Sequence, residues 1–216
     1  MFADRTEAGR RLAALLRERE VTPDIVLAVP RGGLPVGRAV ADEFDVPLDI
    51  VAAKKLGAPG NPELAIGAVA HDGSSWLNED LVVRLGVDDT YVERERERAA
   101  ETALEKVERY RAGRPPLDLA GKRVVVVDDG VATGATTRAC LRAVRNTGAD
   151  RVTLAVPVGP PDSIRELESE ADEVVCVERP RAFGAVGQFY RQFGQVTDEE
   201  AMAYLESEAE TEGEEE

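Results

Sequence analysis

The sequence predicts an α/β protein with a central, mainly parallel β-sheet flanked by helices, and three observations predict this class. The apolar runs are short and do not alternate with polar residues, which is typical of strands buried on both faces. Helical patterns separate these runs along the chain. The length of 216 residues suits one domain with a sizeable core. We therefore expect a single domain over residues 1–205, followed by an acidic, disordered tail over residues 206–216.

The first half of the chain begins with a helical pattern, because Leu12, Leu15 and Leu16 recur at helical spacing. A short apolar run follows and ends at the glycine-rich turn Pro30-Arg31-Gly32-Gly33, which predicts a buried strand and then a turn. The expected elements are, in order, a helix over residues 6–20, a strand over 25–29, a helix over 34–44, a strand over 46–53 that ends at two lysines, a loop over 57–62, and paired strands over 64–70 and 75–77.

The second half of the chain alternates helices and strands. Asn78 is a candidate cap for a short helix through Leu85. The long helical pattern that follows carries alternating charges, which is typical of a helix face exposed to solvent. The expected elements after Leu85 are a helix over 88–111, a strand over 122–129, a helix over 135–146, a strand over 151–158, a helix over 162–170 and a strand over 173–177.

The composition is strongly acidic. There are 42 Asp and Glu residues against 27 Lys and Arg residues, so the formal net charge is −15, and only 4 of the basic residues are lysines. Such a negative field disfavours nonspecific binding to nucleic acid and to anionic membranes, and we expect neither as a partner. The composition resembles that of proteins from halophiles that accumulate salt, and an acidic protein from a GC-rich genome is the alternative. An anionic substrate would require a local positive pocket.

The cysteine, histidine and apolar content of the chain excludes further classes of protein. The two cysteines, Cys140 and Cys176, lie in apolar runs, which excludes a disulfide scaffold and a cysteine-based zinc site. His71 is the single histidine, so a histidine-rich metal site is excluded too. No stretch approaches the ~18 uninterrupted apolar residues of a membrane span, and the N-terminus shows no apolar signal region. We expect a cytoplasmic protein.

The segment over residues 124–136, VVVVDDGVATGAT, carries the strongest chemical signal. Four valines predict a central strand, and Asp128 and Asp129 follow at its carboxyl end, where open α/β sheets bind their ligands. A loop of small residues then leads into a helix, whose free N–H groups and positive dipole end favour a phosphate. Acids beside a phosphate site suit a sugar phosphate, because hydroxyls can bind the acids. The alternative is that Asp128-Asp129-Gly130 is only a polar turn.

This 13-residue segment resembles the 5-phosphoribosyl-1-pyrophosphate (PRPP) signature of the type I phosphoribosyltransferases. It is neither a P-loop, since no Gly-Lys-Ser/Thr follows, nor a Rossmann fingerprint, since the acids precede the glycines. The resemblance implies the fold of that family with a small hood region. It also implies that Asp128 and Asp129 hold the ribose 2′- and 3′-hydroxyls. The residues implied to wrap the 5-phosphate are Val131, Ala132, Thr133, Gly134, Ala135 and Thr136.

Two further segments are candidates for binding pyrophosphate. In the family, the loop that follows the first core strand holds the pyrophosphate, and here that loop contains Arg31, Gly32 and Gly33. The glycines permit close approach of the backbone to an anion, and the arginine adds charge. Lys54 and Lys55 are adjacent in a chain that is poor in lysine, and we assign them to the active site as cations for pyrophosphate; surface lysines at a strand end are the alternative. A mobile loop with more cations is expected in residues 57–62 or among the arginines of residues 94–114.

The sequence predicts the metal site and the acceptor pocket less closely than the phosphate site. Asp128 or Asp129 is the expected contact for Mg²⁺, because this ion binds few carboxylates together with substrate phosphates. The acceptor pocket has three candidates: His71, Trp76, and the aromatic and glycine-rich run over residues 181–195, in which Phe189 and Phe193 are equally explained by packing. Hypoxanthine- and guanine-specific members of the family carry an acid where this chain has Ala132, so the loop looks more like those of adenine- or uracil-type members.

The sequence therefore predicts an Mg²⁺-dependent phosphoribosyltransferase that transfers the 5-phosphoribosyl group of PRPP to a nitrogenous base and releases pyrophosphate. Asp128, Asp129, Lys54 and Lys55 are the expected catalytic residues, and a homodimer is a possible assembly. Two alternatives remain open. One is a noncatalytic regulator that binds PRPP or a nucleotide on the same fold. The other is a hydrolase that uses the same phosphate site with water as the nucleophile.

Overall fold

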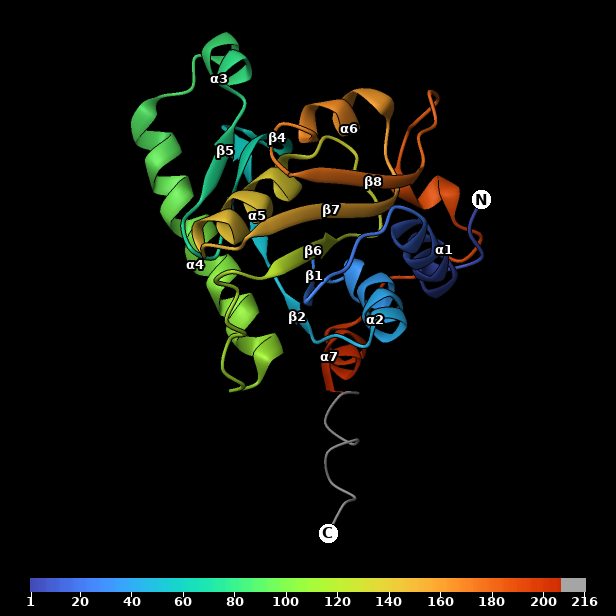
Figure 1. Cartoon of the computed structure of the whole chain (residues 1–216). Helices are drawn as coiled ribbons and strands as arrows, with labels where there is room; N and C mark the ends of the chain where they lie inside the picture. The colour runs from blue at the N-terminus through green and yellow to red at the C-terminus, as the bar shows by residue number, and fades with distance from the viewer. Residues whose placement is uncertain (207–216) are drawn as a thin grey trace.

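The core of the protein is a sheet of five parallel strands, as the sequence predicts. The computed structural model describes residues 1–206. The strands occur in the order β2-β1-β6-β7-β8 (Figure 1), and every neighbouring pair is parallel. Their bounds are Ile25–Ala28 for β1, Leu48–Ile50 for β2, Arg123–Val127 for β6, Arg151–Val158 for β7 and Glu173–Glu178 for β8.

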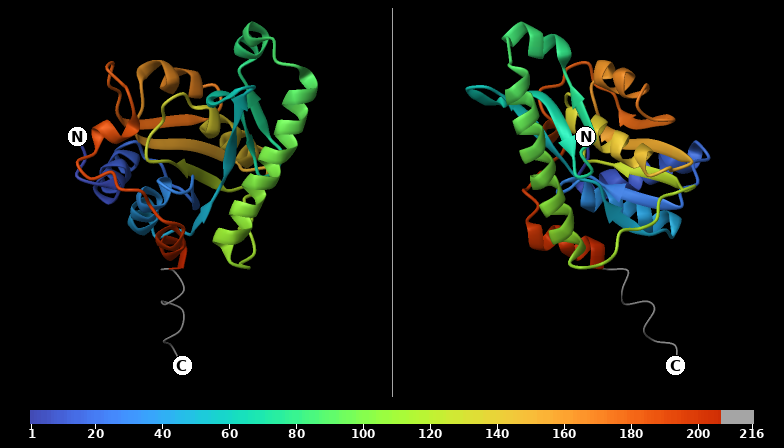
Figure 2. Two further views of the ribbon diagram at one scale, coloured as in Figure 1. Left: turned by 180° about the vertical axis from the view of Figure 1, so that it is seen from behind. Right: turned by 90° about the vertical axis from the view of Figure 1, so that its left-hand side faces the viewer.

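Helices cover both faces of this sheet (Figure 2), and this explains the unbroken apolar strands. Val124 and Val126 face α5 (Ala135–Asn146) and α6 (Pro161–Leu167) in one buried cluster. Val125 and Val127 face the opposite side. That second cluster contains α1 (Arg5–Glu18), α2 (Gly33–Phe44) and part of α4 (Asp89–Arg111). No helix within residues 1–206 is both long enough and apolar enough to cross a lipid bilayer.

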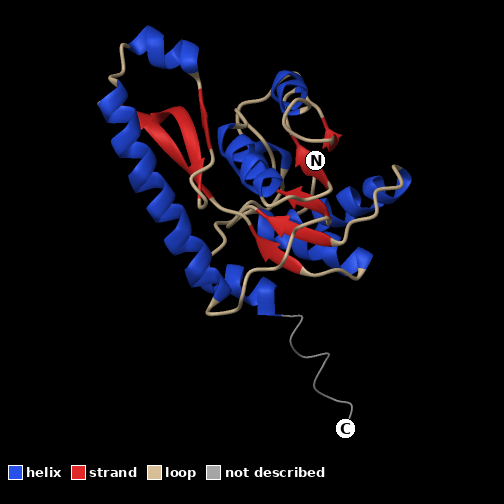
Figure 3. Cartoon of the chain, turned by 60° about the vertical axis from the view of Figure 1, so that its left-hand side comes forward, coloured by secondary structure: helices blue, strands red, loops and turns tan. Residues whose placement is uncertain are grey.

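Residues 53–111 form a hood beside the main sheet (Figure 3). An antiparallel sheet of β3 (Ala53–Ala58), β4 (Asn61–Ala70) and β5 (Ser75–Leu77) packs against α4 through its own apolar cluster. The short α3 (Glu79–Leu85) begins at Asn78, whose side chain accepts a hydrogen bond from the Leu81 N–H, as the capping prediction requires.

The strand expected over residues 46–53 is wrong in its extent. The main-sheet strand β2 ends at Ile50, and the chain then leaves the sheet to pair Ala53 with Ala70 in the hood. Lys54 and Lys55 therefore lie inside β3 and do not end a strand. The loop expected over 57–62 is the tight end of the β3–β4 hairpin, where Gly60 adopts a φ of 74°. Periodicity alone does not show that an apolar run changes sheets.

The end of the chain contains two elements that the sequence analysis does not predict. A short 3-10 helix, η1, spans Val186–Phe189, and α7 spans Asp198–Glu206. Ala201 and Leu205 of α7 are fully buried in the same cluster as α2 and α4. The predicted acidic tail lies outside the described residues, except for Glu206 at the end of α7.

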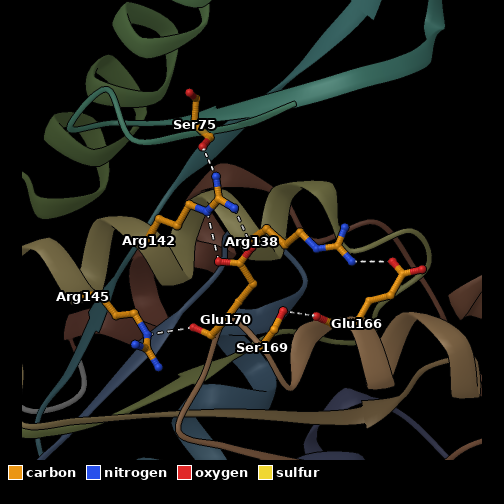
Figure 4. A network of polar contacts seen from close by, with 7 residues as sticks. All are labelled: Ser75, Arg138, Arg142, Arg145, Glu166, Ser169 and Glu170. Carbon is orange, nitrogen blue, oxygen red and sulfur yellow. Dashed lines mark hydrogen bonds and ion pairs between the residues drawn. The ribbon is translucent and has the colours of Figure 1, made fainter. Parts of the chain in front are cut away.

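A polar network fixes α5 between α6 and the hood (Figure 4). Arg142 forms two hydrogen bonds with the Glu170 carboxylate, at 3.0 and 2.6 Å, and a third with the Ser75 carbonyl at 2.8 Å. Arg138 pairs with Glu166 at 2.5 Å, and its guanidinium lies 4.6 Å from the centre of the Trp76 ring. Because α5 begins at the predicted phosphate loop, this network helps to hold that loop in place.

Candidate active site

The site lies where the order of the parallel strands reverses. β1 and β6 are neighbours at the centre of the sheet, β2 continues the sheet on one side and β7 on the other. The loops that follow β1 and β6 therefore lead to helices on opposite faces of the sheet, and α/β sheets bind ligands in a crevice at the carboxyl ends of such strands. Residues 29–33 follow β1, and residues 128–134 follow β6, so both predicted motifs border this crevice.

The two loops touch each other through glycines. A Cβ on Gly32 would lie 2.0 Å from Oδ2 of Asp129, and a Cβ on Gly33 would lie 2.9 Å from the Val127 carbonyl oxygen. At Gly33 the neighbouring atoms are backbone, so a side chain would not fit there, and a side chain at position 32 would displace the Asp129 carboxylate. Both glycines thus have a structural reason in addition to the expected anion contact. The peptide bond between Pro30 and Arg31 is cis.

The second loop presents open backbone amides. We call residues 131–136 the phosphate loop. Gly134 caps α5 with a φ of 77° and without a side-chain capping bond. The N–H groups of residues 132–134 donate to no acceptor within residues 1–206. Two hydrogen bonds fix the loop to β7 and α6. The Val131 N–H donates to the Val158 carbonyl, and the Ser163 hydroxyl donates to the Ala132 carbonyl at 2.6 Å. Open amides at the start of a 12-residue helix can bind an anion, as the sequence predicts for this loop.

Asp128 and Asp129, which we call the acid pair, lie between the two loops. Burial and the negative charge of Asp129 raise the pKa of Asp128 well above its usual range. Burial also raises the pKa of Asp129, and a hydrogen bond from Arg5 opposes this effect. The Asp129 N–H donates to Oδ1 of Asp128 at 2.8 Å. The protein therefore maintains two carboxyl groups at a position where ionisation is unfavourable, and hydroxyl donors or a cation would stabilise them.

A positive cavity of about 300 Å³ lies beside the first loop. Four of its lining residues are cations, which we call the cation corner: Arg31, Lys54, Lys106 and Arg109. Nζ of Lys106 donates to the Pro30 carbonyl at 3.1 Å, which places α4 directly over the loop. Burial and the neighbouring Arg31 lower the pKa of Lys106. The corner supplies the local positive charge that an anionic ligand needs in a protein of net charge −15.

An acid from the C-terminal helix also enters the cation corner. Asp198, the first residue of α7, lies 3.5 Å from Arg31 and 2.9 Å from Arg109, and it accepts a hydrogen bond from the Tyr110 hydroxyl. Lys106, Arg109 and Asp198 were not predicted individually as site residues. The sequence predicts a mobile loop with further cations in residues 57–62 or 94–114, but the second segment is helical as far as Arg111, and this helix supplies Lys106 and Arg109. The rarity of lysine in this chain is the signal that Lys106 offered.

The other predicted residues lie elsewhere. Lys55 is exposed and does not line the cavity that Lys54 lines, as expected for neighbours on one strand. Trp76 packs on Arg138 of α5. His71 lines a separate cavity of about 220 Å³ beside the ion pair of Asp49 and Arg111, and burial lowers its pKa. Neither His71 nor Trp76 is brought to the crevice by the contacts that the structure shows.

The aromatic run over residues 181–195 packs on itself and on the N-terminus. The ring of Tyr190 lies 5.0 Å from that of Phe193 and 5.3 Å from that of the fully buried Phe2. The Phe2 N–H donates to the Phe189 carbonyl at 2.7 Å. The Tyr190 hydroxyl donates to the main-chain oxygen of Asp129 at 2.5 Å. This run therefore borders the acid pair, and much of its aromatic surface is used for packing.

Comparison with known proteins agrees with this geometry. A model of the phosphoribosyl transferase domain matches residues 3–193. A Mycobacterium tuberculosis protein named "Putative phosphoribosyl transferase" is 43% identical over 206 residues, which cover 95% of this chain and 46% of that protein. An amidophosphoribosyltransferase of the same species is 31% identical over 162 residues, covering 74% of this chain and 23% of that enzyme. The chain thus spans less than half the length of these curated relatives.

A solved structure is similar over nearly its whole length. The crystal structure of TT1426 from Thermus thermophilus is 43% identical to this chain, with a TM-score of 0.80, and the match covers 95% of this chain and 97% of that one. The match of the domain model to most of the sequence, together with the placement of both predicted motifs at the ends of β1 and β6, leads to one conclusion: this chain belongs to the phosphoribosyl transferase domain family.

Proposed function

We propose that this domain is an Mg²⁺-dependent phosphoribosyltransferase that transfers the 5-phosphoribosyl group of PRPP to a nitrogenous base and releases pyrophosphate. One observation carries the proposal: three groups with different chemistry lie near one another at the carboxyl ends of β1 and β6. These groups are the open amides of the phosphate loop, the acid pair, and the cation corner. PRPP has a matching group for each, namely a terminal phosphate, a ribose diol and a pyrophosphate.

The reaction follows from this arrangement. The phosphate loop binds the 5-phosphate and so fixes the ribose, while an acid accepts hydrogen bonds from the diol. Departure of pyrophosphate from C1 builds positive charge on the ribose ring, as in glycoside hydrolysis. Arg31, Lys54 and Lys106 stabilise the negative charge that develops on the leaving pyrophosphate. The acceptor then attacks C1 from the side that borders the aromatic run, where Tyr190 contacts Asp129.

The donor set fits Mg²⁺. Within residues 1–206 no three His, Cys, Asp or Glu residues form a metal-binding group. Mg²⁺ typically binds one or two carboxylates and completes its shell with water and substrate phosphates, so a single carboxylate at the crevice is sufficient. Asp128 would hold the ion, with Asp129 as the second candidate. When bound with PRPP, the ion would neutralise charge on the pyrophosphate.

A noncatalytic regulator is the second candidate function. A regulator needs the phosphate loop to recognise its ligand, but it does not need cations aimed at a leaving group. The cation corner favours the enzyme, because two of its members, Lys106 and Arg109, come from a separate helix and meet Arg31 beside the first loop. A hydrolase would use the same groups, and only product analysis separates it from a transferase.

Pyrophosphate release tests the proposal directly. The protein is incubated with PRPP and Mg²⁺ in low and in molar salt, against a panel of purine and pyrimidine bases. Release that depends on a base supports the transferase. Release without a base indicates a hydrolase, and binding of PRPP without release indicates a regulator. The salt comparison also tests the halophilic origin that the acidic composition favours.

A further inference from the structure

The peptide unit between Ala132 and Thr133 is bound by the protein on one side and open on the other. The Ser163 hydroxyl donates to the Ala132 carbonyl at 2.6 Å, while the Thr133 N–H donates to no acceptor within residues 1–206. Both Ala132 and Thr133 are exposed, so a ligand has access to this part of the phosphate loop. A residue from outside the loop therefore binds the oxygen of a peptide whose N–H is free.

The planarity of this peptide fixes the direction of its free N–H. The peptide bond is trans, and in a planar trans peptide the C=O and N–H bonds point in opposite directions. The Ala132 oxygen points toward Ser163, the third residue of α6, so the Thr133 N–H points away from α6. Rotation of this peptide by half a turn would instead present a partly negative oxygen to an incoming anion.

Ser163 acts from a firm support, because α6 is fixed to the helix that follows the loop. Glu166 of α6 pairs with Arg138 of α5 at 2.5 Å (Figure 4). Leu167 is fully buried, and a Cβ on Gly134 would lie 3.4 Å from its side chain, so α6 packs directly against the start of α5. The Ser163 hydroxyl therefore holds the loop in register with the amides at the start of α5.

We propose that Ser163 is a positioning residue for the phosphate site: its hydroxyl holds the Ala132 carbonyl and thereby directs the Thr133 N–H at the 5-phosphate. The inference rests on the proposed function, since it takes the phosphate loop as the site of that phosphate. The hydrogen bond keeps the peptide in one orientation before the ligand arrives, which lowers the cost of ordering the loop. It also polarises the peptide, so that the N–H becomes a stronger donor.

This role predicts a selective effect on binding. The only hydrogen bond that the Ser163 side chain forms within residues 1–206 is the one to Ala132. The cation corner is built from other parts of the chain, namely the first loop, β3 and α4. Loss of the hydroxyl should therefore weaken binding of a sugar phosphate and spare binding of pyrophosphate. A merely structural role would lower thermal stability and affect both ligands together.

Calorimetric titration of the full chain with ribose 5-phosphate and, separately, with pyrophosphate tests the proposal. Ser163→Ala should weaken ribose 5-phosphate binding by ~3- to 10-fold, as expected for loss of one neutral hydrogen bond. Pyrophosphate binding should stay within about twofold of the wild type. Ser163→Thr keeps the hydroxyl and should recover most of the affinity. In NMR spectra, saturating ribose 5-phosphate should shift the Thr133 amide signal in the wild type and much less in S163A.

The matched control is Ser169→Ala. Ser169 follows the same helix, and its hydroxyl also donates to a main-chain carbonyl, that of Glu166 at 2.8 Å, but neither residue belongs to the phosphate loop. This variant should bind both ligands like the wild type. Thermal melting compares the structural cost of losing each hydroxyl, and S163A and S169A should melt at similar temperatures.

Two results would overturn the inference. If S163A binds ribose 5-phosphate like the wild type, the hydroxyl does not direct the loop. If S163A weakens binding of both ligands equally, its effect is structural. The proposed function fails separately: a wild type that binds ribose 5-phosphate but never releases pyrophosphate from PRPP is no transferase, and the affinity ratio still decides the role of Ser163. A wild type without affinity for ribose 5-phosphate overturns the inference as well.

Discussion

The phosphate loop follows β6 and the cation corner lies beside the loop that follows β1, and the two are built in different ways. The phosphate loop is continuous in sequence, and it offers backbone N–H groups that carry no net charge. The cation corner gathers side chains from the first loop, from β3 and from α4, with Asp198 of α7 among them. One expected anion site is therefore encoded locally, whereas the other depends on how three separate parts of the chain are packed.

The difference also predicts different sensitivities. Backbone amides do not titrate and are fixed by the helix that they begin, so the phosphate loop should respond mainly to changes of backbone conformation. The cation corner consists of long side chains in an acidic protein, so it should respond to loss of single charges, to salt and to pH. Variants that affect one site and spare the other test this difference.

The largest effect is expected from Gly134→Val. A β-branched residue is strained at the φ of 77°, so the loop should change conformation and its amides should turn from the anion. Loss of two charge-assisted hydrogen bonds predicts a ~100-fold loss of affinity for ribose 5-phosphate, with pyrophosphate binding changed much less. Gly148→Val is the control, because Gly148 has a φ of 81° at the other end of α5. Equal affinity losses in the two variants would contradict the assignment.

Lys106→Met should have the next largest effect. The variant keeps the aliphatic stem over the first loop but removes the charge, so affinity for pyrophosphate should fall by ~10- to 30-fold, as for one charged hydrogen bond. Binding of ribose 5-phosphate should stay within about twofold of the wild type. The control is Lys122→Met, since Lys122 is exposed outside the site. Calorimetric titration with each ligand provides the measurement, and unchanged pyrophosphate binding would remove α4 from the site.

Substitution of the adjacent lysines of β3 should change pyrophosphate affinity less, and only one of the two lysines should matter. Lys54 lines the cavity but is exposed, so Lys54→Met should weaken pyrophosphate binding by ~3-fold, within the range of exposed charge pairs. Lys55→Met should leave it unchanged, because successive side chains of a strand point to opposite faces. The same titration compares both variants. Equal losses would show that the two lysines act together, as the sequence alone suggested.

The smallest effect should be a dependence on pH. The pKa of Lys106 is lowered from 10.5 by burial and by Arg31, so its charge is lost at a lower pH than that of an ordinary lysine. The advantage of the wild type over K106M in pyrophosphate affinity is therefore complete at low pH and declines as pH rises toward 10.5. The decline should begin at a lower pH than for an ordinary lysine, because the pKa of Lys106 is lowered. A constant ratio would contradict a lowered pKa.

Local patterns predicted much of this fold. The helix Ala135–Asn146 and the strand Arg151–Val158 match the predictions residue for residue, because each has its own apolar pattern and is bounded by residues that end it. The strand expected over residues 46–53 failed, since the same apolar run serves two sheets. The helix α7 was missed because its apolar face, Ala201 and Leu205, is small and is defined by the neighbours that it contacts.

The strand, the acid pair and the phosphate loop over residues 124–136, and with them the family, were predictable from the sequence, because these groups are neighbours along the chain and their geometry is local. Which cations lie beside the first loop, and which side chain pairs with Asp129, follows from the packing of distant segments. Lys106 and Pro30 are 76 residues apart, and Arg5 and Asp129 are 124 residues apart. Contacts over such separations depend on the packing of whole elements, which no pattern within one segment contains.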